Sequence, residues 1–280
     1  MIEIPKGAMG IQATSRPDYD EALTTYEKLV LAAIRFSDLS GGMNTTRRGI
    51  ESTKIYTRIT LSAMTINALL PGNYINRTRL WDFPSIAALT RTFMEVCHRY
   101  LYLSEEGLSD EEAAFRLSLY YFHLNSEKYK LYQQSNVDAE TLKEFEDRLP
   151  KAKAELMDYP AYKALHKKRA DDVRSGNTCM HLTDDEASLR FALLPGKFKQ
   201  MYRLLSTHAH GAPFATSSQS DERGRGLENE IETAYVRLTL LVLHQYLSKA
   251  ILNQAALLSL KDRAPAEFQY CVETLGASRK

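Results

Sequence analysis

The chain has 280 residues, of which 44% are hydrophobic and 25% are charged, and this composition is typical of a globular protein that buries a sizeable core. Its 36 lysines and arginines nearly balance its 35 aspartates and glutamates, which excludes a strong net electrostatic field. Any nucleic-acid binding therefore needs a local basic patch. The three cysteines lie far apart and no apolar run is long enough to span a bilayer, so we expect a cytoplasmic protein without disulfides or a membrane segment.

Apolar residues recur at helical spacing along most of the chain, and no alternating run predicts a strand. Prolines and glycines in residues 1–17 indicate an irregular N-terminal arm. Pro150 predicts a kink or a break inside one helix. The periodic stretches and their end signals predict an all-α, multi-helix bundle of about eight helices, at about 18–40, 45–70, 85–103, 109–134, 138–157, 183–194, 197–211 and 227–260.

The predicted helices form one bundle domain over residues 18–260. Within it, residues 211–226 are small and polar, which predicts a flexible loop. The stretch 227–260 is apolar nearly all round and should lie at the centre of the bundle. Residues 261–280 form a C-terminal tail with room for a short helix.

One predicted helix, residues 85–103, carries a polar stripe. At 100° per residue, Arg91, Glu95, His98 and Tyr102 fall within about 60° of one another. The stripe is either a solvated face with an Arg91–Glu95 ion pair or, if later helices cover it, a group of polar side chains that must be satisfied and that marks a functional site.

The predicted helix 197–211, KFKQMYRLLSTHAHG, ends in two histidines and a glycine. Arg203 and His210 share its polar face, whereas His208 leans toward the apolar face. An arginine beside a histidine suits phosphodiester chemistry, because the guanidinium binds a phosphate and the imidazole acts as acid or base at neutral pH. The alternative is a plain helix end, with cationic side chains near its negative pole and a glycine cap.

A basic patch after Pro160 contains Lys167 and Lys168, which are either a solvated face or a contact for RNA. Cys179 with His181, and His208 with His210, are ligand types that zinc accepts, but neither pair has the spacing of a known zinc motif. No phosphate-binding glycine motif is present. We therefore expect no metal and no cofactor.

The arginine and histidines late in a helical chain resemble the R-x(4–6)-H motif of the HEPN superfamily, many of whose members are metal-independent ribonucleases of bacterial defence and toxin systems. The resemblance implies that Arg203 and His208 are the catalytic pair, with His210 as the alternative histidine. We assign supporting roles to Tyr202 and Ser206 on the same helix. The resemblance also implies RNA as a partner and a homodimer that completes the site.

A second resemblance covers about residues 75–260. The pair LTRTFMEVCHRYLYL, residues 89–103, and YRLLSTHAHG, residues 202–211, is similar to a group of uncharacterised bacterial helical domains. Two functions follow as expectations: a metal-independent endoribonuclease or RNA-binding protein, and a non-catalytic scaffold or ligand-binding bundle. In the second, Arg91, Glu95, Tyr202 and His208 form a buried polar network.

Overall fold

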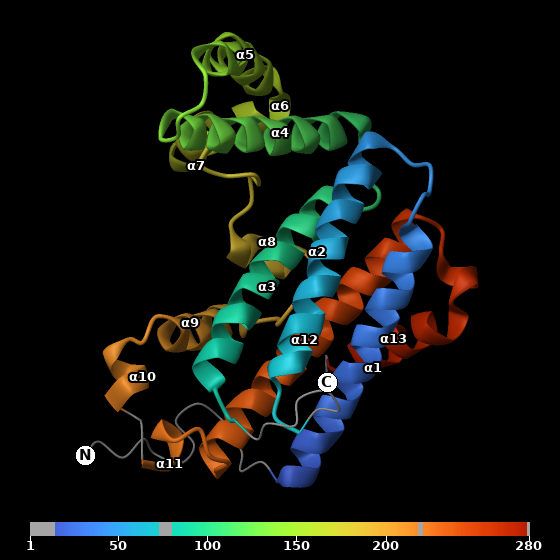
Figure 1. Cartoon of the computed structure of the whole chain (residues 1–280). Coiled ribbons are helices and arrows are strands. Elements are labelled where there is room, and N and C mark those ends of the chain that lie inside the picture. Colours follow the sequence, from blue (N-terminus) through green and yellow to red (C-terminus); the bar gives the residue numbers. More distant parts are fainter. Residues whose placement is uncertain (1–14, 73–79, 218–220, 279–280) are drawn as a thin grey trace.

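The computed structural model describes residues 15–72, 80–217 and 221–278, and every regular element in these ranges is a helix (Figure 1). The long helices are α1 (Arg16–Ser40), α2 (Arg47–Leu69), α3 (Phe83–Ser104), α4 (Asp110–Gln133), α5 (Ala139–Asp158) and α12 (Glu230–Leu257). The shorter ones are α6 (Pro160–Lys163), α7 (Lys167–Arg174), α8 (Asp184–Arg190), α9 (Phe198–Ala209), α10 (Pro213–Ser217), α11 (Asp221–Gly224) and α13 (Pro265–Ala277).

The all-α prediction is confirmed, but the expected number of about eight helices is too low. The additional helices are mostly short and lie where connections were expected, as with α6, α7, α10 and α11. Helices of four to eight residues carry too few residues to produce a clear periodic pattern. None of the described helices combines the length and the apolar character that are needed to cross a membrane.

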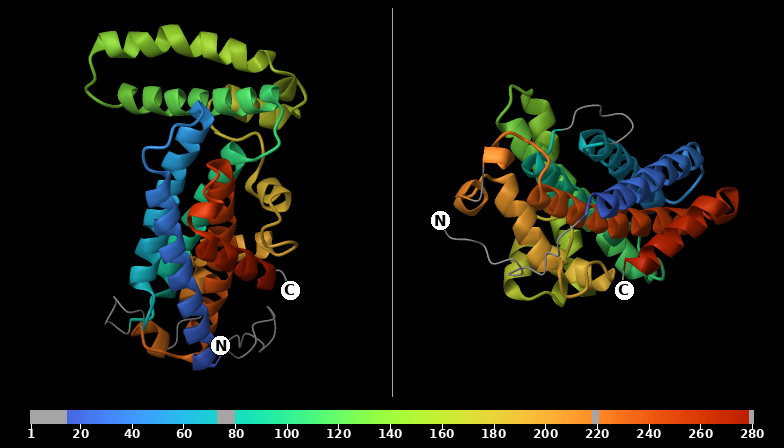
Figure 2. Two further views of the ribbon diagram at one scale, coloured as in Figure 1. Left: turned by 90° about the vertical axis from the view of Figure 1, so that its right-hand side faces the viewer. Right: turned by 90° about the horizontal axis from the view of Figure 1, so that it is seen from below.

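Helices α1, α2, α3 and α12 form the main bundle, with α13 packed on α12 and α9 packed on α3 (Figures 1 and 2). Helix α12 contacts α1, α2, α3 and α13, so its central position agrees with its apolar sequence. Large aromatic side chains fill the core, among them Tyr26, Phe36, Tyr56 and Tyr246. The hydroxyls of the three tyrosines are satisfied inside the bundle, as when Tyr26 donates to the carbonyl of Ala63 at 3.1 Å.

Side chains at the helix starts fix several boundaries. Ser15 and Asp18 form a capping box, and for this reason α1 begins at Arg16, inside the expected N-terminal arm. Thr183 and Glu186 form the predicted capping box of α8. Residues 1–14, the remainder of the arm, lie outside the described residues.

Helices α4 to α7 form a small unit that lies across one end of the main bundle (Figure 2). It has its own apolar cluster, which includes Phe115, Leu119 and Val173, so the expected single domain contains two separate hydrophobic cores. The sequence predicted a kink or a break at Pro150, and helix α5 continues through this residue without a break. Of its residues only Leu156 is buried, so water can satisfy the carbonyl that Pro150 leaves without a donor.

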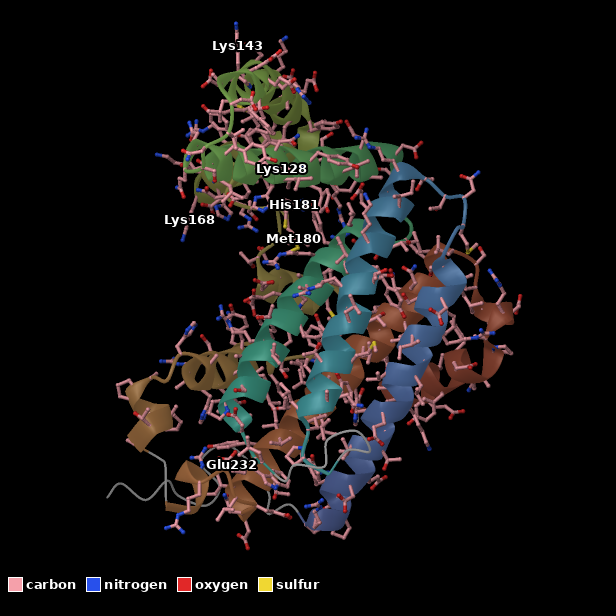
Figure 3. All side chains as sticks on the ribbon, in the orientation of Figure 1. Lys128, Lys143, Lys168, Met180, His181 and Glu232 are labelled. Atoms are coloured by element: carbon pink, nitrogen blue, oxygen red, sulfur yellow. The ribbon has the colours of Figure 1, made fainter. Side chains whose placement is uncertain are left out.

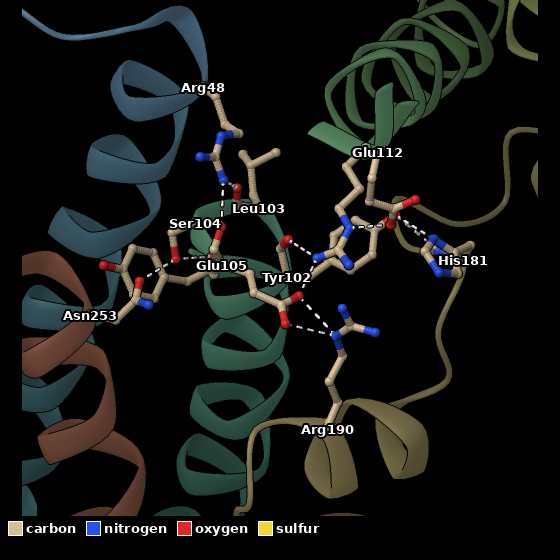
Figure 4. Close-up of polar contacts among 11 residues, drawn as sticks. Arg48, Tyr102, Leu103, Ser104, Glu105, Glu112, His181, Arg190 and Asn253 are labelled. Atoms are coloured by element: carbon tan, nitrogen blue, oxygen red, sulfur yellow. Dashed lines mark hydrogen bonds and ion pairs between the residues drawn. The ribbon is translucent and has the colours of Figure 1, made fainter. Parts of the chain in front are cut away.

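The small unit is held to the bundle by a buried arginine, Arg116 of α4, whose partners Tyr102, Glu105 and Glu112 are labelled in Figure 4. Its Nη1 donates to the carbonyl of Tyr102 at 2.6 Å and to Glu105 Oε2 at 2.7 Å. Its Nε donates to Glu112 Oε1 at 2.7 Å. Because Arg116 is fully buried, these acceptors compensate for removing its charge from water.

Two segments outside the predicted long helices contain helices of their own. Residues 211–226, where a flexible loop was expected, contain α10 and α11, with Ala215 and Arg223 buried; residues 218–220 lie outside the described ranges. In the C-terminal tail α13 spans 13 residues and packs on the bundle through Cys271 and Leu275.

Candidate functional site

Four side chains from α3 and α9 join in one hydrogen-bonded group, named here the α3–α9 polar cluster: Arg91, Glu95, Tyr202 and His210. Arg91 is central, because its Nη2 donates to the Tyr202 hydroxyl at 2.8 Å and its Nη1 lies 3.0 Å from His210 Nε2. The Tyr202 hydroxyl donates to Glu95 Oε1 at 2.8 Å, and that oxygen lies 3.2 Å from Arg91 Nη2. The cluster therefore joins side chains that are between 107 and 119 residues apart in the chain.

The local sequence explains why these groups meet. Arg91 and Glu95 are one helical turn apart on α3, which places them on the same face. The apolar face of α9, with Met201 and Leu205 buried, packs against the bundle and brings Tyr202 over α3. His210 follows the last residue of α9, at the position where the helix ends.

The contact with the arginine shows which atom of the histidine accepts the hydrogen bond. A guanidinium carries only N–H donors, so His210 Nε2 must accept from Arg91 Nη1. The imidazole is then neutral, with its proton on Nδ1. This assignment follows from the hydrogen-bond partners. A basic nitrogen and a permanent cation thus lie within one hydrogen bond of each other.

The cluster is open to solvent on one side. The side chains of Arg91 and Glu95 are 26% and 20% exposed, and His210 is exposed. The Arg91 guanidinium carbon lies 5.0 Å from the centre of the Tyr202 ring, a cation–π contact. Burial raises the pKa of Tyr202, so its hydroxyl stays protonated and keeps its hydrogen bond to Glu95. A ligand can therefore reach a group whose internal geometry is already set.

The other two members of the predicted α3 stripe do not join the cluster. His98 is fully buried, with Nδ1 2.8 Å from Asp184 Oδ1 and Nε2 2.9 Å from the Tyr246 hydroxyl. The Tyr102 hydroxyl lies 2.8 Å from His181 Nδ1, at the junction with the small unit (Figure 4). Later elements cover His98 and Tyr102, and each of these two side chains has partners of its own outside the cluster.

The predicted catalytic residues on α9 are separated in space. Arg203 is exposed, and among the described residues no contact joins it to the α3–α9 polar cluster. His208 is only 2% exposed and packs against Phe83 and Tyr235, at ring-centre distances of 4.8 and 5.4 Å. Burial lowers the pKa of His208 to about 4, so it is neutral at physiological pH. Ser206 is half-buried.

His208 lines a second site, named here the His208 pocket, with a volume of about 430 Å³. Beside it a buried ion pair joins Arg223 Nε to Glu232 Oε1 at 2.6 Å, with both side chains less than 5% exposed. Burial raises the pKa of Glu232, and Arg223 opposes that shift. Sequence reasoning missed this pair because Arg223 lies in the polar segment that was expected to be a loop. No pattern in the sequence indicates that Glu232 is its buried partner.

Lys167 and Lys168 do not approach the cluster. Both are exposed on α7, in the small unit, and Figure 3 shows Lys168 near the opposite end of the molecule from Glu232. In the described residues no group of three or more His, Cys, Asp or Glu side chains is arranged to hold a metal ion. The chemistry available at the α3–α9 polar cluster is anion binding by Arg91 and proton transfer by His210.

Comparisons with protein-family models, with curated proteins and with solved structures find no match to this chain. The two resemblances in the sequence therefore stay predictions, and the candidate site is defined by its own geometry.

Proposed function

We propose that the protein is a metal-independent endoribonuclease of the bacterial defence or toxin type, with the α3–α9 polar cluster as its active site. The observation that carries this proposal is the 3.0 Å contact between Arg91 Nη1 and His210 Nε2. A guanidinium holds a phosphate through paired N–H donors, and a neutral imidazole accepts a proton at physiological pH. The cluster offers both groups, side by side and open to solvent.

In the proposed reaction the scissile phosphate takes the place of His210 on the N–H donors of Arg91. His210 Nε2 accepts the proton of the ribose 2′-hydroxyl, whose oxygen forms a bond to phosphorus while the bond from phosphorus to the 5′ oxygen breaks. Water protonates the departing 5′ oxygen, and the resulting hydroxide takes the proton from the imidazolium. The products are a 2′,3′-cyclic phosphate and a 5′-hydroxyl end.

Tyr202 and Glu95 position Arg91 in this proposal. Their hydrogen bonds leave the guanidinium little freedom before substrate binds, and such preorganisation lowers the cost of ordering the site. Arg203, exposed on the same helix, is a further phosphate contact. His210 takes the acid–base role in preference to His208, because His208 is buried in an aromatic environment.

We also propose that two copies of the chain form a homodimer through this face. The support is that His210 and Arg203 are exposed on α9, so a second copy can close the site without rearranging the bundle. Light scattering of the purified protein tests this part of the proposal. A mass of about 64 kDa supports it, twice the chain mass of 31.8 kDa, and a mass of one chain at the assay concentration contradicts it.

A second candidate function is that of a ligand-binding bundle, and the His208 pocket favours it. A buried arginine, glutamate and histidine line this cavity, and its volume lies within the range of about 300 to 1,000 Å³ that ligand sites occupy. The network differs from the predicted one, since it contains His208 but not Arg91, Glu95 or Tyr202. A ligand that raises the melting temperature of the wild type and not of Glu232→Gln would support this function.

The experiment that tests the ribonuclease is incubation of the purified protein with mixed RNA, with and without EDTA. The proposal expects cleavage in both conditions, and product ends that carry a 2′,3′-cyclic phosphate and a 5′-hydroxyl. The absence of cleavage, or cleavage that EDTA abolishes, contradicts it.

A further inference from the structure

A cleft of about 750 Å³ lies between the main bundle and the small unit, and it is named here the α2–α4 cleft. Its walls come from α2, α3, α4 and the segment 177–184, so it forms only where the two hydrophobic cores meet. Its lining includes Arg58 of α2, Arg99 of α3 and Tyr120 of α4. The volume is sufficient for a drug-sized ligand or for a short part of a polymer.

The lining of the cleft is basic, although the whole chain has a net charge of only +1. Four cationic side chains line it, Lys54, Arg58, Arg99 and Arg169, against two carboxylates, Glu127 and Asp184, which gives a lining charge of +2. Both carboxylates already have cationic or hydrogen-bonding partners: Glu127 pairs with Lys130 at 2.7 Å and Asp184 with His98 at 2.8 Å. The cleft is therefore a local basic patch of the kind that an anionic polymer needs.

Two of the four cations have close contacts within the protein, and the other two are held more weakly. Arg169 donates to the backbone carbonyls of Met180, His181 and Leu182 and so holds the segment that forms one wall. Lys54 pairs with Glu51 at 2.8 Å. Arg58 is exposed. The guanidinium of Arg99, whose side chain is 44% exposed, comes no closer than 3.8 Å to Glu95 and also contacts the Cys179 side chain. Arg58 and Arg99 are thus the cations that can take up phosphates.

The 3.8 Å contact between Arg99 and Glu95 connects the cleft to the candidate active site. Glu95, the partner of Arg99, belongs to the α3–α9 polar cluster. Arg91 and Arg99 are eight residues apart on α3, which corresponds to about 12 Å along the helix axis. That distance equals about three to four nucleotides at the 3.4 Å rise of a stacked strand. One strand can therefore contact both arginines.

Tyr120 supplies an aromatic ring to the same cleft. It is half-buried and packs edge-on against Tyr121, with ring centres 5.5 Å apart. Aromatic side chains that stack on bases, combined with cations that follow the backbone, are the usual means of binding a single strand without reading its sequence.

We propose that the α2–α4 cleft binds single-stranded RNA next to the scissile phosphate, with phosphates on Arg58 and Arg99 and a base against Tyr120. The choice of RNA rests on the proposed function, whereas the binding of a single strand rests on the cleft itself.

The test measures binding by fluorescence anisotropy with a fluorescein-labelled 12-nucleotide uridine-rich RNA. His210→Ala is used as the background, so that the probe is not cut. Adding Arg58→Ala and Arg99→Ala together should weaken binding at least about tenfold. The slope of log K against log salt concentration should also become smaller in magnitude by about 1.4. The matched control adds Arg35→Ala and Arg148→Ala, two exposed arginines outside the cleft that remove the same charge. It should leave the affinity unchanged.

A second pair of variants separates stacking from folding. Tyr120→Phe keeps an aromatic ring and should retain binding, whereas Tyr120→Leu should weaken it by about fivefold to 100-fold. Equal affinity in the two tyrosine variants, equal losses in the two double-arginine variants, or no RNA binding at all overturns the proposal. Displacement of the RNA by polyglutamate at the same concentration of charge overturns it as well, because the cleft would then recognise charge alone.

The outcomes separate the two proposals. RNA binding that depends on Arg58 and Arg99, in a protein that does not cleave RNA, supports the cleft and contradicts the ribonuclease. Cleavage of RNA by a protein whose binding does not depend on these arginines does the reverse.

Discussion

Arg91 and His210 are 119 residues apart in the chain, yet Arg91 Nη1 and His210 Nε2 lie 3.0 Å apart where the end of α9 meets α3. In this contact the lone pair of His210 Nε2 faces a cation, and Arg91 is itself held by the hydrogen bonds that Tyr202 makes to Arg91 and Glu95.

Removing the Tyr202 hydroxyl should loosen the cluster. In Tyr202→Phe the Arg91–Glu95 ion pair remains at 3.2 Å, but the bridging hydrogen bonds are lost. We expect unfolding in urea to show a loss of about 1 to 2 kcal/mol. The RNA cleavage rate should fall at the same time, because Arg91 is no longer held. An unchanged rate and an unchanged free energy of unfolding would show that the hydroxyl does not position Arg91.

Buried histidines should make stability depend on pH. Desolvation lowers the pKa of His208 and of His244 to about 4, whereas an unfolded histidine has a pKa of about 6.5. Between these values the unfolded chain binds more protons, so this stability is fully present above about pH 6.5 and is lost as the pH falls toward 4. Each histidine contributes about 1.4 kcal/mol per pH unit in that window.

The variant His208→Phe isolates one of these groups. Its free energy of unfolding is measured in urea from pH 4.5 to 7.5. Below about pH 6.5 it should vary with pH less steeply than that of the wild type, by about 1.4 kcal/mol per pH unit, and above that pH the two slopes should agree. The aromatic neighbours of His208 can accommodate a phenyl ring, so the variant is expected to fold. Identical slopes in the two proteins would argue against a neutral, buried His208.

Arg116 should be essential for joining the small unit to the bundle. The substitution Arg116→Ala leaves the carboxylates of Glu105 and Glu112 without their shared buried partner and should cost about 3 to 5 kcal/mol in the free energy of unfolding. The control Arg148→Ala removes an exposed i,i+4 pair with Glu144 and should cost less than about 0.5 kcal/mol. Similar losses in the two variants would mean that the junction contributes little to stability.

Gly176 follows α7 and should not accept a side chain. Its φ is +67°, and a Cβ atom there would lie 2.4 Å from Ser126 Oγ, which donates to the carbonyl of Phe122. Gly42 has a similar φ of +71° but nothing within 4 Å of the added atom. Gly42→Ala should therefore cost about 1 to 2 kcal/mol from backbone strain alone, and Gly176→Ala should cost more. Thermal unfolding of the two variants measures the difference, and equal melting temperatures would contradict the predicted clash.

Local sequence patterns predicted the helices well, because each long helix carries its own periodicity and end signals. Thr183 and Glu186 predicted the start of α8, and the apolar character of residues 227–260 predicted the central helix. The continuation of α5 through Pro150 was not predictable in this way. Whether a proline breaks a helix depends on solvent access to the freed carbonyl, which only the packing decides.

The candidate site was predictable as two faces but not as one group. The helical wheel placed Arg91 and Glu95 on one polar face, and it placed His210 on another. They meet because α3 and α9 cross. The sequence of either helix alone does not predict that crossing. The wheel also predicted that His208 leans toward the core, and the structure confirms this position with 2% exposure. The buried partners Arg223 and Glu232 had no local signal.

The most direct test of the proposed function is the rate of RNA cleavage in EDTA for the wild type and four single variants. We expect Arg91→Ala and His210→Ala to lower the rate by about 100-fold or more, the loss expected for a general base or for a group that binds the reacting charge. His208→Phe and Arg35→Ala, which change a buried histidine outside the cluster and an exposed arginine on α1, should cleave at nearly the wild-type rate. Cleavage that survives His210→Ala, or a wild-type protein that cleaves no RNA, would contradict the account.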